Sequence, residues 1–174
     1  VPIASLTKLM TAMVVLDAGQ DLDERLEILD WIAKPPNNGW SRMRIGSRAR
    51  RGDLLRIALM SSENLATHVL AQHHPDGFRG FVQAMNDKAA ALGMTASTFV
   101  EPSGLDPRNR ASAADLARMV RAAHGYERIR AYSTTRAHQV AFDRPRYRLR
   151  YGNTNPLLAD PRWPVKPSKT GYLG

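Results

Sequence analysis

The sequence predicts an α+β fold, or the related three-layer α/β sandwich, in which a helical body carries a few antiparallel strands. Three observations support this class. Between residues 4 and 131, apolar residues recur at helical spacing in several segments, whereas from residue 135 they alternate with polar ones. Clusters of Gly, Pro and Asn separate these segments, as turns require. The 174 residues suffice for one domain with a proper core and are too few for two ordinary ones.

The amino-terminal part is expected to hold one helix and two short strands. The helix covers residues 4–17, and Gly19 follows at the place of a left-handed C-cap. One strand is expected within residues 22–32 and a short edge strand over residues 42–45. Residues 35–39, which read Pro-Pro-Asn-Asn-Gly, predict a turn-rich break between them.

Helical spacing recurs through the middle of the chain. The helices are expected over residues 51–60, 64–72 and 78–92, then from a capping box at 112–115 to Gly125, with a short helical turn through Ile129. In the first of these helices Arg51, Asp53 and Arg56 are expected to face solvent, opposite the apolar side. Between the first two, the polar residues Ser61-Ser62-Glu63-Asn64 favour a helix break or caps.

The carboxy-terminal part predicts a hairpin and one further strand. Alternation from residue 135 to 151 is interrupted by Asp143-Arg144-Pro145, which gives two strands joined by a turn. The second strand has an aromatic-aliphatic face and a basic face. After a turn at residues 153–156, a final strand is expected over residues 166–173.

Composition narrows the classes of partner and site. The formal net charge of +9 favours an anionic partner, such as nucleic acid, a membrane surface or an acidic polymer. The chain has no cysteine, which excludes disulfides, thiolate nucleophiles and Cys-ligated metals. His68, His73 and His74 cannot form an i, i+4 zinc pair, and His124 and His138 are expected at the surface or in loops, so no metal site is expected. No apolar run approaches membrane-spanning length.

The start of the first helix carries a candidate nucleophile and base. Ser5 and Lys8 are three residues apart, which places a hydroxyl and an amine on the same helix face. A serine becomes a nucleophile when a neighbouring base takes its proton, and a lysine is such a base when burial or nearby positive charge lowers its pKa. The alternative is a capping serine with a solvated lysine behind it.

Two further short motifs follow in a fixed order. Ser62-Glu63-Asn64 comes after the second helix, and Lys169-Thr170-Gly171 lies on the final expected strand. Taken alone, Ser62 and Asn64 are more simply explained as helix caps, and Lys169 as a solvated charge on an edge strand. Together with Ser5-x-x-Lys8 they form the S-x-x-K, S-x-N, K-T-G set of penicillin-recognising serine enzymes.

The flanks of the three motifs extend this resemblance over essentially the whole chain. Residues 2–13, 58–64, 153–155 and 168–172 closely resemble those of the low-molecular-mass penicillin-binding proteins, the D-alanyl-D-alanine peptidases of bacterial cell-wall maintenance. The Ser-Glu-Asn form is more similar to the endopeptidases than to the carboxypeptidases, which usually carry Ser-Gly-Asn. The resemblance implies a β-lactamase/transpeptidase-like fold, with an antiparallel sheet flanked by helices and a mostly helical subdomain.

The resemblance also implies a role for each motif residue. Ser5 would attack a D-Ala carbonyl, Lys8 would take its proton, and Ser62 would relay a proton between Lys8 and the leaving amine. The substrate-binding residues would be Asn64, Lys169, Thr170 and Gly171. The backbone N–H groups of Ser5 and Tyr172 would form the oxyanion hole. Water would then hydrolyse the acyl-enzyme, and no cofactor is implied.

The same resemblance sets the expected organisation and surroundings. Residues 1–174 would be a single serine peptidase domain, with a helical part over residues 51–131 and the hairpin and motif strand over residues 135–174. Strands that flank the motifs in the family are expected to be missing here, so the chain is expected to be a truncated form. The implied partners are D-Ala-containing peptidoglycan peptides and, as covalent inhibitors, β-lactams. The implied location is the periplasm, with peripheral association to cell wall or membrane surface.

Three alternatives remain open at this stage. A DD-carboxypeptidase would use the same residues on a terminal D-Ala. A class A β-lactamase would need a Glu-x-x-Leu-Asn segment for its deacylating water, and no convincing one lies between the second and third motifs. A non-enzymatic binder of an anionic polymer would use the strand that carries Arg146, Arg148 and Arg150. Because Tyr147 and Tyr151 face away from these arginines, no nucleic acid is expected.

Overall fold

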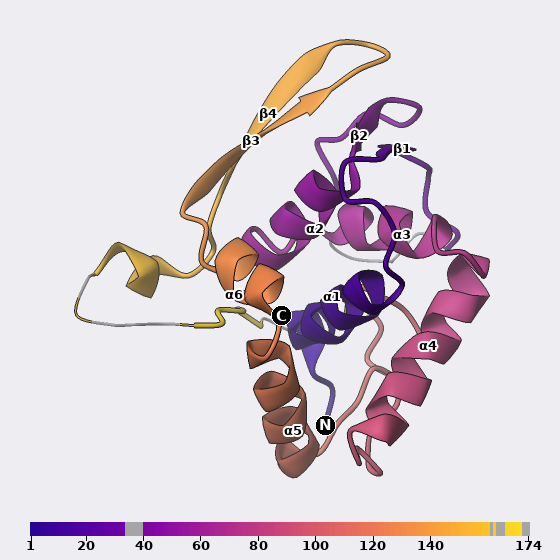
Figure 1. Ribbon diagram of the computed structural model, residues 1–174, viewed down its shortest axis with the longest axis vertical. Coiled ribbons are helices and arrows are strands. Elements are labelled where there is room, and N and C mark those ends of the chain that lie inside the picture. Colours follow the sequence, from indigo (N-terminus) through magenta and orange to yellow (C-terminus); the bar gives the residue numbers. More distant parts are fainter. Residues whose placement is uncertain (34–39, 161, 163–165, 172–174) are drawn as a thin grey trace.

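The computed structural model describes residues 1–33, 40–160, 162 and 166–171, and its fold is α+β, as predicted. Figure 1 shows the helices gathered around α1 and a two-stranded ribbon, β3–β4, that projects away from them. The helices are η1 (Ala4–Leu6), α1 (Thr7–Asp17), α2 (Arg51–Met60), α3 (Asn64–Gln72), α4 (Gly77–Ala91), α5 (Ala113–His124), α6 (Glu127–Ser133) and η2 (Pro156–Ala159). The strands are β1 (Arg25–Glu27), β2 (Arg48–Arg50), β3 (Ala137–Phe142) and β4 (Tyr147–Gly152).

Helix α1 is the centre of the core. Every residue from Thr7 to Val15 is buried, and α1 contacts α2, α3, α4, α5 and α6. A helix that is apolar on almost all sides is stable only when other elements cover it all round. Lys8 is therefore an ionisable side chain placed inside a helix that is buried on all sides at this point. No helix in the described part has the length and apolar content needed to cross a membrane.

The predicted helices are confirmed, with one difference that concerns the site. The first expected helix divides into a 3-10 turn, η1, and the α-helix proper from Thr7, so Ser5 precedes the α-helix. Gly19 has φ +63°, as expected for a left-handed cap. The Ser112 side chain accepts a hydrogen bond from the Asp115 backbone N–H at 3.1 Å, which confirms the predicted capping of α5.

The first sheet is smaller than expected and uses a different strand. Strand β1 covers only Arg25–Glu27 of the expected 22–32 segment, and it pairs antiparallel with β2. The edge strand expected over residues 42–45 is wrong, because the strand forms at Arg48–Arg50. There Ala49 is buried opposite Leu26, whereas Ile45 is exposed, so the later register buries more apolar surface.

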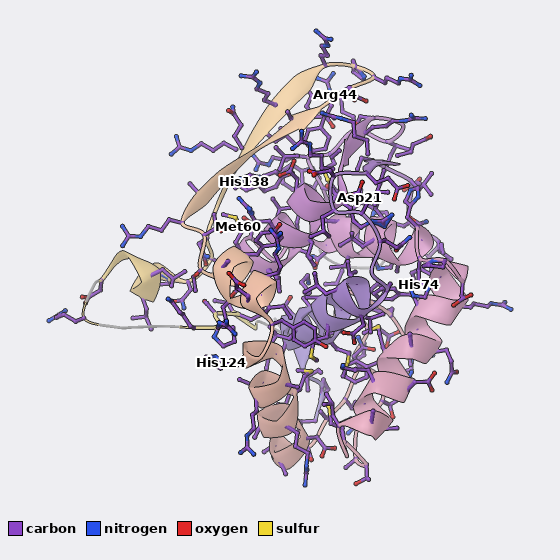
Figure 2. All side chains as sticks on the ribbon, in the orientation of Figure 1. Asp21, Arg44, Met60, His74, His124 and His138 are labelled. Carbon is purple, nitrogen blue, oxygen red and sulfur yellow. The ribbon has the colours of Figure 1, made fainter. Side chains whose placement is uncertain are left out.

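The second sheet is the predicted hairpin. Strands β3 and β4 pair antiparallel, with His138 opposite Tyr151 and Val140 opposite Leu149. Arg148 and Arg150 on β4, and Arg146 just before it, are exposed, whereas Tyr151 is buried, so the two predicted faces are confirmed. Figure 2 shows long side chains that project from this ribbon into solvent, and places His138 at its base beside α2.

Two other expectations are corrected. Arg51 does not face solvent: its guanidinium is buried and donates to Asp21 O at 3.2 Å and to Gln20 Oε1 at 3.1 Å, because the segment before β1 folds over it. The strand expected over residues 166–173 does not form in its described part, residues 166–171, because these residues have no backbone ladder with another described segment. Tyr172 and Leu173 lie outside the described residues.

Candidate active site

The site begins where η1 joins α1. Ser5 lies in the 3-10 turn and Lys8 in the first turn of the α-helix, and Lys8 Nζ is 3.1 Å from Ser5 Oγ. Ala4, just before Ser5, has a positive φ of 48°, which few non-glycine residues adopt. The strained turn places the Ser5 hydroxyl and the Lys8 amine side by side, as the three-residue spacing predicts.

Lys8 is enclosed by two carbonyl oxygens from other parts of the chain. Its Nζ donates to Asn64 Oδ1 at 2.7 Å and to Ser103 O at 2.6 Å, and the side chain is 1% exposed. Burial, together with the charge of Lys169, lowers the pKa of Lys8 to about 7, although Glu101 and Glu63 oppose the shift. At neutral pH a large fraction of Lys8 is therefore an uncharged amine beside a hydroxyl.

Ser62 and Lys169 approach Ser5 from the other side. Ser62 lies between α2 and α3 with φ +58°, and its Oγ donates to Ser5 Oγ at 2.9 Å. Lys169 Nζ donates to Ser62 Oγ at 2.9 Å and to Thr170 O at 2.7 Å. Burial lowers the pKa of Lys169 to about 8. The four side chains form one chain of contacts, in the order Lys169, Ser62, Ser5, Lys8.

The third motif is held in place by side chains rather than by a strand ladder. Ser168 is buried, its N–H donates to Ser133 Oγ at 3.1 Å, and its hydroxyl accepts from Asn155 Nδ2 at 2.9 Å. Thr170 Oγ1 is 2.6 Å from Thr154 Oγ1, and the Thr154 N–H donates to Met60 O at 2.9 Å. Residues 153–155 thus connect the motif to the end of α2.

Gly171 is next to the turn that carries Ser5. A Cβ built on Gly171 would lie 3.6 Å from Leu6 Cγ and 4.0 Å from Ala4 Cβ. The Ser5 N–H, one of the two expected oxyanion donors, belongs to this turn. The other expected donor, the N–H of Tyr172, lies outside the described residues.

Sequence reasoning missed the turn at residues 101–104, which supports Lys8 through the Ser103 carbonyl. Glu101 accepts hydrogen bonds from the Ser103 N–H at 2.7 Å, the Ser103 hydroxyl at 2.5 Å and the Gly104 N–H at 2.5 Å. It also accepts from Asn109 Nδ2 at 2.9 Å, and His68 Nε2 is 3.4 Å away. Burial acts to raise the pKa of Glu101, but the hydrogen bonds from His68 and Ser103 outweigh it and leave that pKa below its usual value. A charged carboxylate therefore fixes the backbone carbonyl of Ser103 that holds Lys8.

The turn also depends on Gly104, which lies against the backbone of η1 at Ala4. Gly104 has φ +85°, and a Cβ at this position would lie 1.9 Å from Ala4 O. Only glycine allows this approach, which brings the Glu101 turn against η1. A Pro-Ser-Gly turn is visible in the sequence, but nothing in it indicates that the turn contacts Lys8.

The arrangement suits acyl transfer. A hydroxyl lies within hydrogen-bond distance of an amine with a pKa near neutrality, and a second hydroxyl links it to a cation, so a nucleophile, a base and a proton donor are assembled together. Among the described residues, no group of three His, Asp or Glu side chains is placed to hold a metal ion.

Comparison with known proteins gives a consistent set of similarities. A family model described as D-alanyl-D-alanine carboxypeptidase matches residues 1–174. The chain is 46% identical over 172 residues to a D-alanyl-D-alanine endopeptidase of Escherichia coli strain K12, covering 98% of this chain and 55% of that protein. It is 48% identical over 172 residues to a D-alanyl-D-alanine endopeptidase of Pseudomonas aeruginosa, covering 99% of this chain and 56% of that protein. The chain therefore spans about half the length of these curated relatives.

A solved structure matches the fold. The crystal structure of the Streptomyces K15 DD-transpeptidase superimposes with a TM-score of 0.87 at 24% sequence identity, covering 98% of this chain and 71% of that one. The helices and ribbons described above therefore correspond to a β-lactamase/transpeptidase-like fold, as the motif resemblance implies.

Proposed function

Because this chain belongs to the D-alanyl-D-alanine carboxypeptidase family of serine peptidases, we propose that it cleaves D-Ala-containing peptides of peptidoglycan through an acyl-enzyme on Ser5. The observation that carries the proposal is the contact between Ser5 Oγ and Lys8 Nζ at 3.1 Å, with a lysine pKa of about 7. A lysine with its ordinary pKa would hold its proton at neutral pH and could not serve as the base.

The hydrogen bonds around Lys8 favour proton transfer from Ser5. A neutral amine has two N–H groups and one lone pair, and the two carbonyl oxygens of Asn64 and Ser103 accept both N–H groups. The lone pair is then left for the Ser5 hydroxyl. As Ser5 Oγ bonds to the D-Ala carbonyl carbon, its proton moves to Lys8.

The remaining motif residues serve the collapse of the tetrahedral intermediate. The carbonyl oxygen gains negative charge, which the Ser5 N–H and the Tyr172 N–H would stabilise. Ser62 gives its proton to the leaving amine as the C–N bond breaks, and regains a proton from Lys8. Asn64, Lys169, Thr170 and Gly171 would line the place of the substrate backbone, with Lys169 as the cation that orients Ser62. Water then hydrolyses the ester and regenerates Ser5.

The same site would be acylated by β-lactams, and the ester should persist. Rapid hydrolysis in a class A β-lactamase uses a glutamate that activates water. Glu101, in the turn between the second and third motifs, is the carboxylate that acts most strongly on the pKa of Lys8, but its oxygens already accept hydrogen bonds from Ser103, Gly104 and Asn109. It is therefore not free to act as a base towards water.

We propose that the physiological bond is a peptide cross-link, so that the enzyme is a DD-endopeptidase. Two relatives at 46% and 48% identity bear this name, and the middle residue of the second motif is Glu63 rather than glycine. A DD-carboxypeptidase, which removes a terminal D-Ala, is the alternative that the family description favours.

The proposed setting is the periplasm, with peripheral association to the anionic cell wall or membrane surface. The support is the formal net charge of +9 and the exposed arginines 146, 148 and 150 on the projecting ribbon. Such an attraction should weaken as salt is added.

Intact-mass spectrometry after incubation with benzylpenicillin tests the acyl-enzyme. The expected result is one stable adduct that maps to Ser5 and is absent from Ser5→Ala, with circular dichroism to verify that both proteins are folded. Digestion of cross-linked and of uncross-linked pentapeptide muropeptides then separates the two peptidase activities. A folded wild-type protein that forms no adduct would exclude the proposed mechanism.

A further inference from the structure

A hollow of about 280 Å³ opens directly beside the catalytic motif. Residues 61–64 form one side of it, and residues 40–42 and 151–152 form the others, so it connects the second motif with the base of the β3–β4 ribbon. The mechanism proposed above uses only Ser62 and Asn64 from this lining. Its volume is slightly below the range of about 300–1,000 Å³ for small-molecule sites, which suits about one amino-acid residue of a larger substrate.

The wall formed by residues 40–42 is fixed by the second motif itself. Glu63 is the N-cap of α3 and accepts from the Ala66 N–H at 2.6 Å, and it is also hydrogen-bonded to the Ser41 side chain. Burial raises the pKa of Glu63. The middle residue of the Ser-Glu-Asn motif thus holds the segment that carries Trp40 and Arg42, and the charges of Lys8 and Arg42 both act on its carboxyl.

Arg42 presents an oriented cation at this wall. Its Nη2 donates to Arg150 O at 2.7 Å, and its Cζ lies 4.6 Å from the centre of the Tyr151 ring. These two contacts fix the guanidinium plane and use one of its five N–H donors, and the side chain is exposed. Beside it, Trp40 is 78% exposed, the highest value for any large apolar side chain in the described residues. An aromatic wall next to a positioned cation suits a ligand with an aliphatic body and a carboxylate.

We propose that this hollow binds the amine-bearing strand of a peptide cross-link, with Arg42 as the partner of a carboxylate on that strand and Trp40 against its aliphatic chain. The inference rests on the proposed function. There, Ser62 protonates the leaving amine, so the residue that carries this amine must reach Ser62 Oγ, and Ser62 is one of the residues that line the hollow. A cross-link differs from a terminal D-Ala in that a diamino acid of a second peptide supplies this amine. The additional chain and its carboxyl group need a place beside Ser62, and the hollow provides one.

The test compares two reactions in the complete protein with Arg42→Ala, Trp40→Ala and wild type. One is hydrolysis of a cross-linked muropeptide dimer, measured as kcat and KM, and the other is acylation by benzylpenicillin, which has no second strand. The matched control is Arg44→Ala: Arg44 is also exposed and lies over a tyrosine of the same strand, Tyr147, at 4.9 Å, but it does not line the hollow.

The expected result is that the ratio of cross-link hydrolysis to penicillin acylation falls about tenfold in Arg42→Ala, mainly through KM, as suits the loss of one charge-assisted contact. Trp40→Ala should lower the same ratio, and Arg44→Ala should leave it at the wild-type value. The inference is overturned if both reactions fall in parallel in Arg42→Ala, or if the ratio is unchanged. A wild-type protein that is folded but neither cleaves the dimer nor reacts with penicillin would instead overturn the proposed function.

Discussion

At the scale of single residues, the decisive feature is that two lysines share one site and burial lowers the pKa of both, with the charge of Lys169 lowering that of Lys8 further. Lys8 is buried in α1 and repelled by Lys169, and Lys169 is itself shifted by burial. Because one pKa is about 7 and the other about 8, there is a narrow interval in which Lys8 is neutral while Lys169 is still charged. Proton transfer along the contacts through Ser62 and Ser5 requires a neutral Lys8 and a charged Lys169 at the same time.

The rate of acylation by a β-lactam should therefore be bell-shaped in pH. It rises as Lys8 loses its proton around pH 7 and falls as Lys169 loses its proton around pH 8. In Lys169→Met the removal of positive charge raises the pKa of Lys8, so the acid limb should move to higher pH and the alkaline limb should disappear. The maximal rate should fall roughly tenfold or more, because a charge-assisted hydrogen bond to Ser62 is lost. Stopped-flow kinetics with a chromogenic cephalosporin measures both limbs, and an unmoved acid limb would contradict the coupling.

At the scale of elements, the turn at residues 101–104 is as important to the site as the three motifs. The Ser103 carbonyl oxygen accepts a hydrogen bond from Lys8 Nζ at 2.6 Å. The two carboxylate oxygens of Glu101 stabilise the turn by accepting hydrogen bonds from the backbone N–H groups of Ser103 and Gly104. Asn109, which is fully buried, adds a further link to Thr7 Oγ1 at 3.3 Å. The helix that carries Lys8 and the turn that holds it are thus bound into one unit.

Glu101→Gln tests this unit with little change of volume. The amide offers one acceptor oxygen in place of two, so at least one turn N–H group would face another N–H group, and unfolding should become easier by about 1–3 kcal/mol. Acylation should slow roughly tenfold or more as the Ser103 carbonyl shifts from Lys8. Because the charge of Glu101 raises the pKa of Lys8, its loss should move the acid limb of the pH profile to lower pH, opposite to Lys169→Met. Wild-type kinetics in a folded variant would show that the turn does not position Lys8.

Features that depend on residues close together in the sequence could be predicted, whereas features that depend on distant residues could not. The helix over residues 51–60 and the pairing of Ser5 with Lys8 rest on neighbours a few residues apart, and both were found. The contact of Lys8 with Ser103 joins residues 95 positions apart, so no local pattern indicates it. Arg51 was misplaced for the same reason, since the segment that buries it ends 27 positions before it. The residues of the third motif were identified, but the strand expected to carry them was not observed in its described part. That part is held by hydrogen bonds with Ser133, Thr154 and Asn155 rather than by a strand ladder.

At the scale of the whole molecule, the site makes the fold less stable than it could be. A lysine with a pKa of about 7 in the folded state and an ordinary value near 10.5 in the unfolded chain binds its proton more weakly when folded, so folding is penalised wherever the unfolded chain is protonated. The penalty is full below pH 7 and vanishes as pH approaches 10.5, which means that the Lys8 contribution to stability improves as pH rises. In Lys8→Met no group titrates at this position, so this pH-dependent penalty on folding is absent.

The free energy of unfolding of wild type, relative to Lys8→Met, should therefore increase by roughly 3 kcal/mol between pH 7 and pH 10. Urea denaturation of both proteins at several pH values measures the difference, in which the titration of all groups common to the two proteins cancels. Lys8→Arg is the informative control. Because an arginine keeps its charge over this range, its free energy of unfolding relative to Lys8→Met should not increase with pH in this way. A constant difference between wild type and Lys8→Met would mean that Lys8 keeps its ordinary pKa in the folded protein. The stability curve and the acid limb of the acylation profile must then fail together, because both measure the same proton on the same amine.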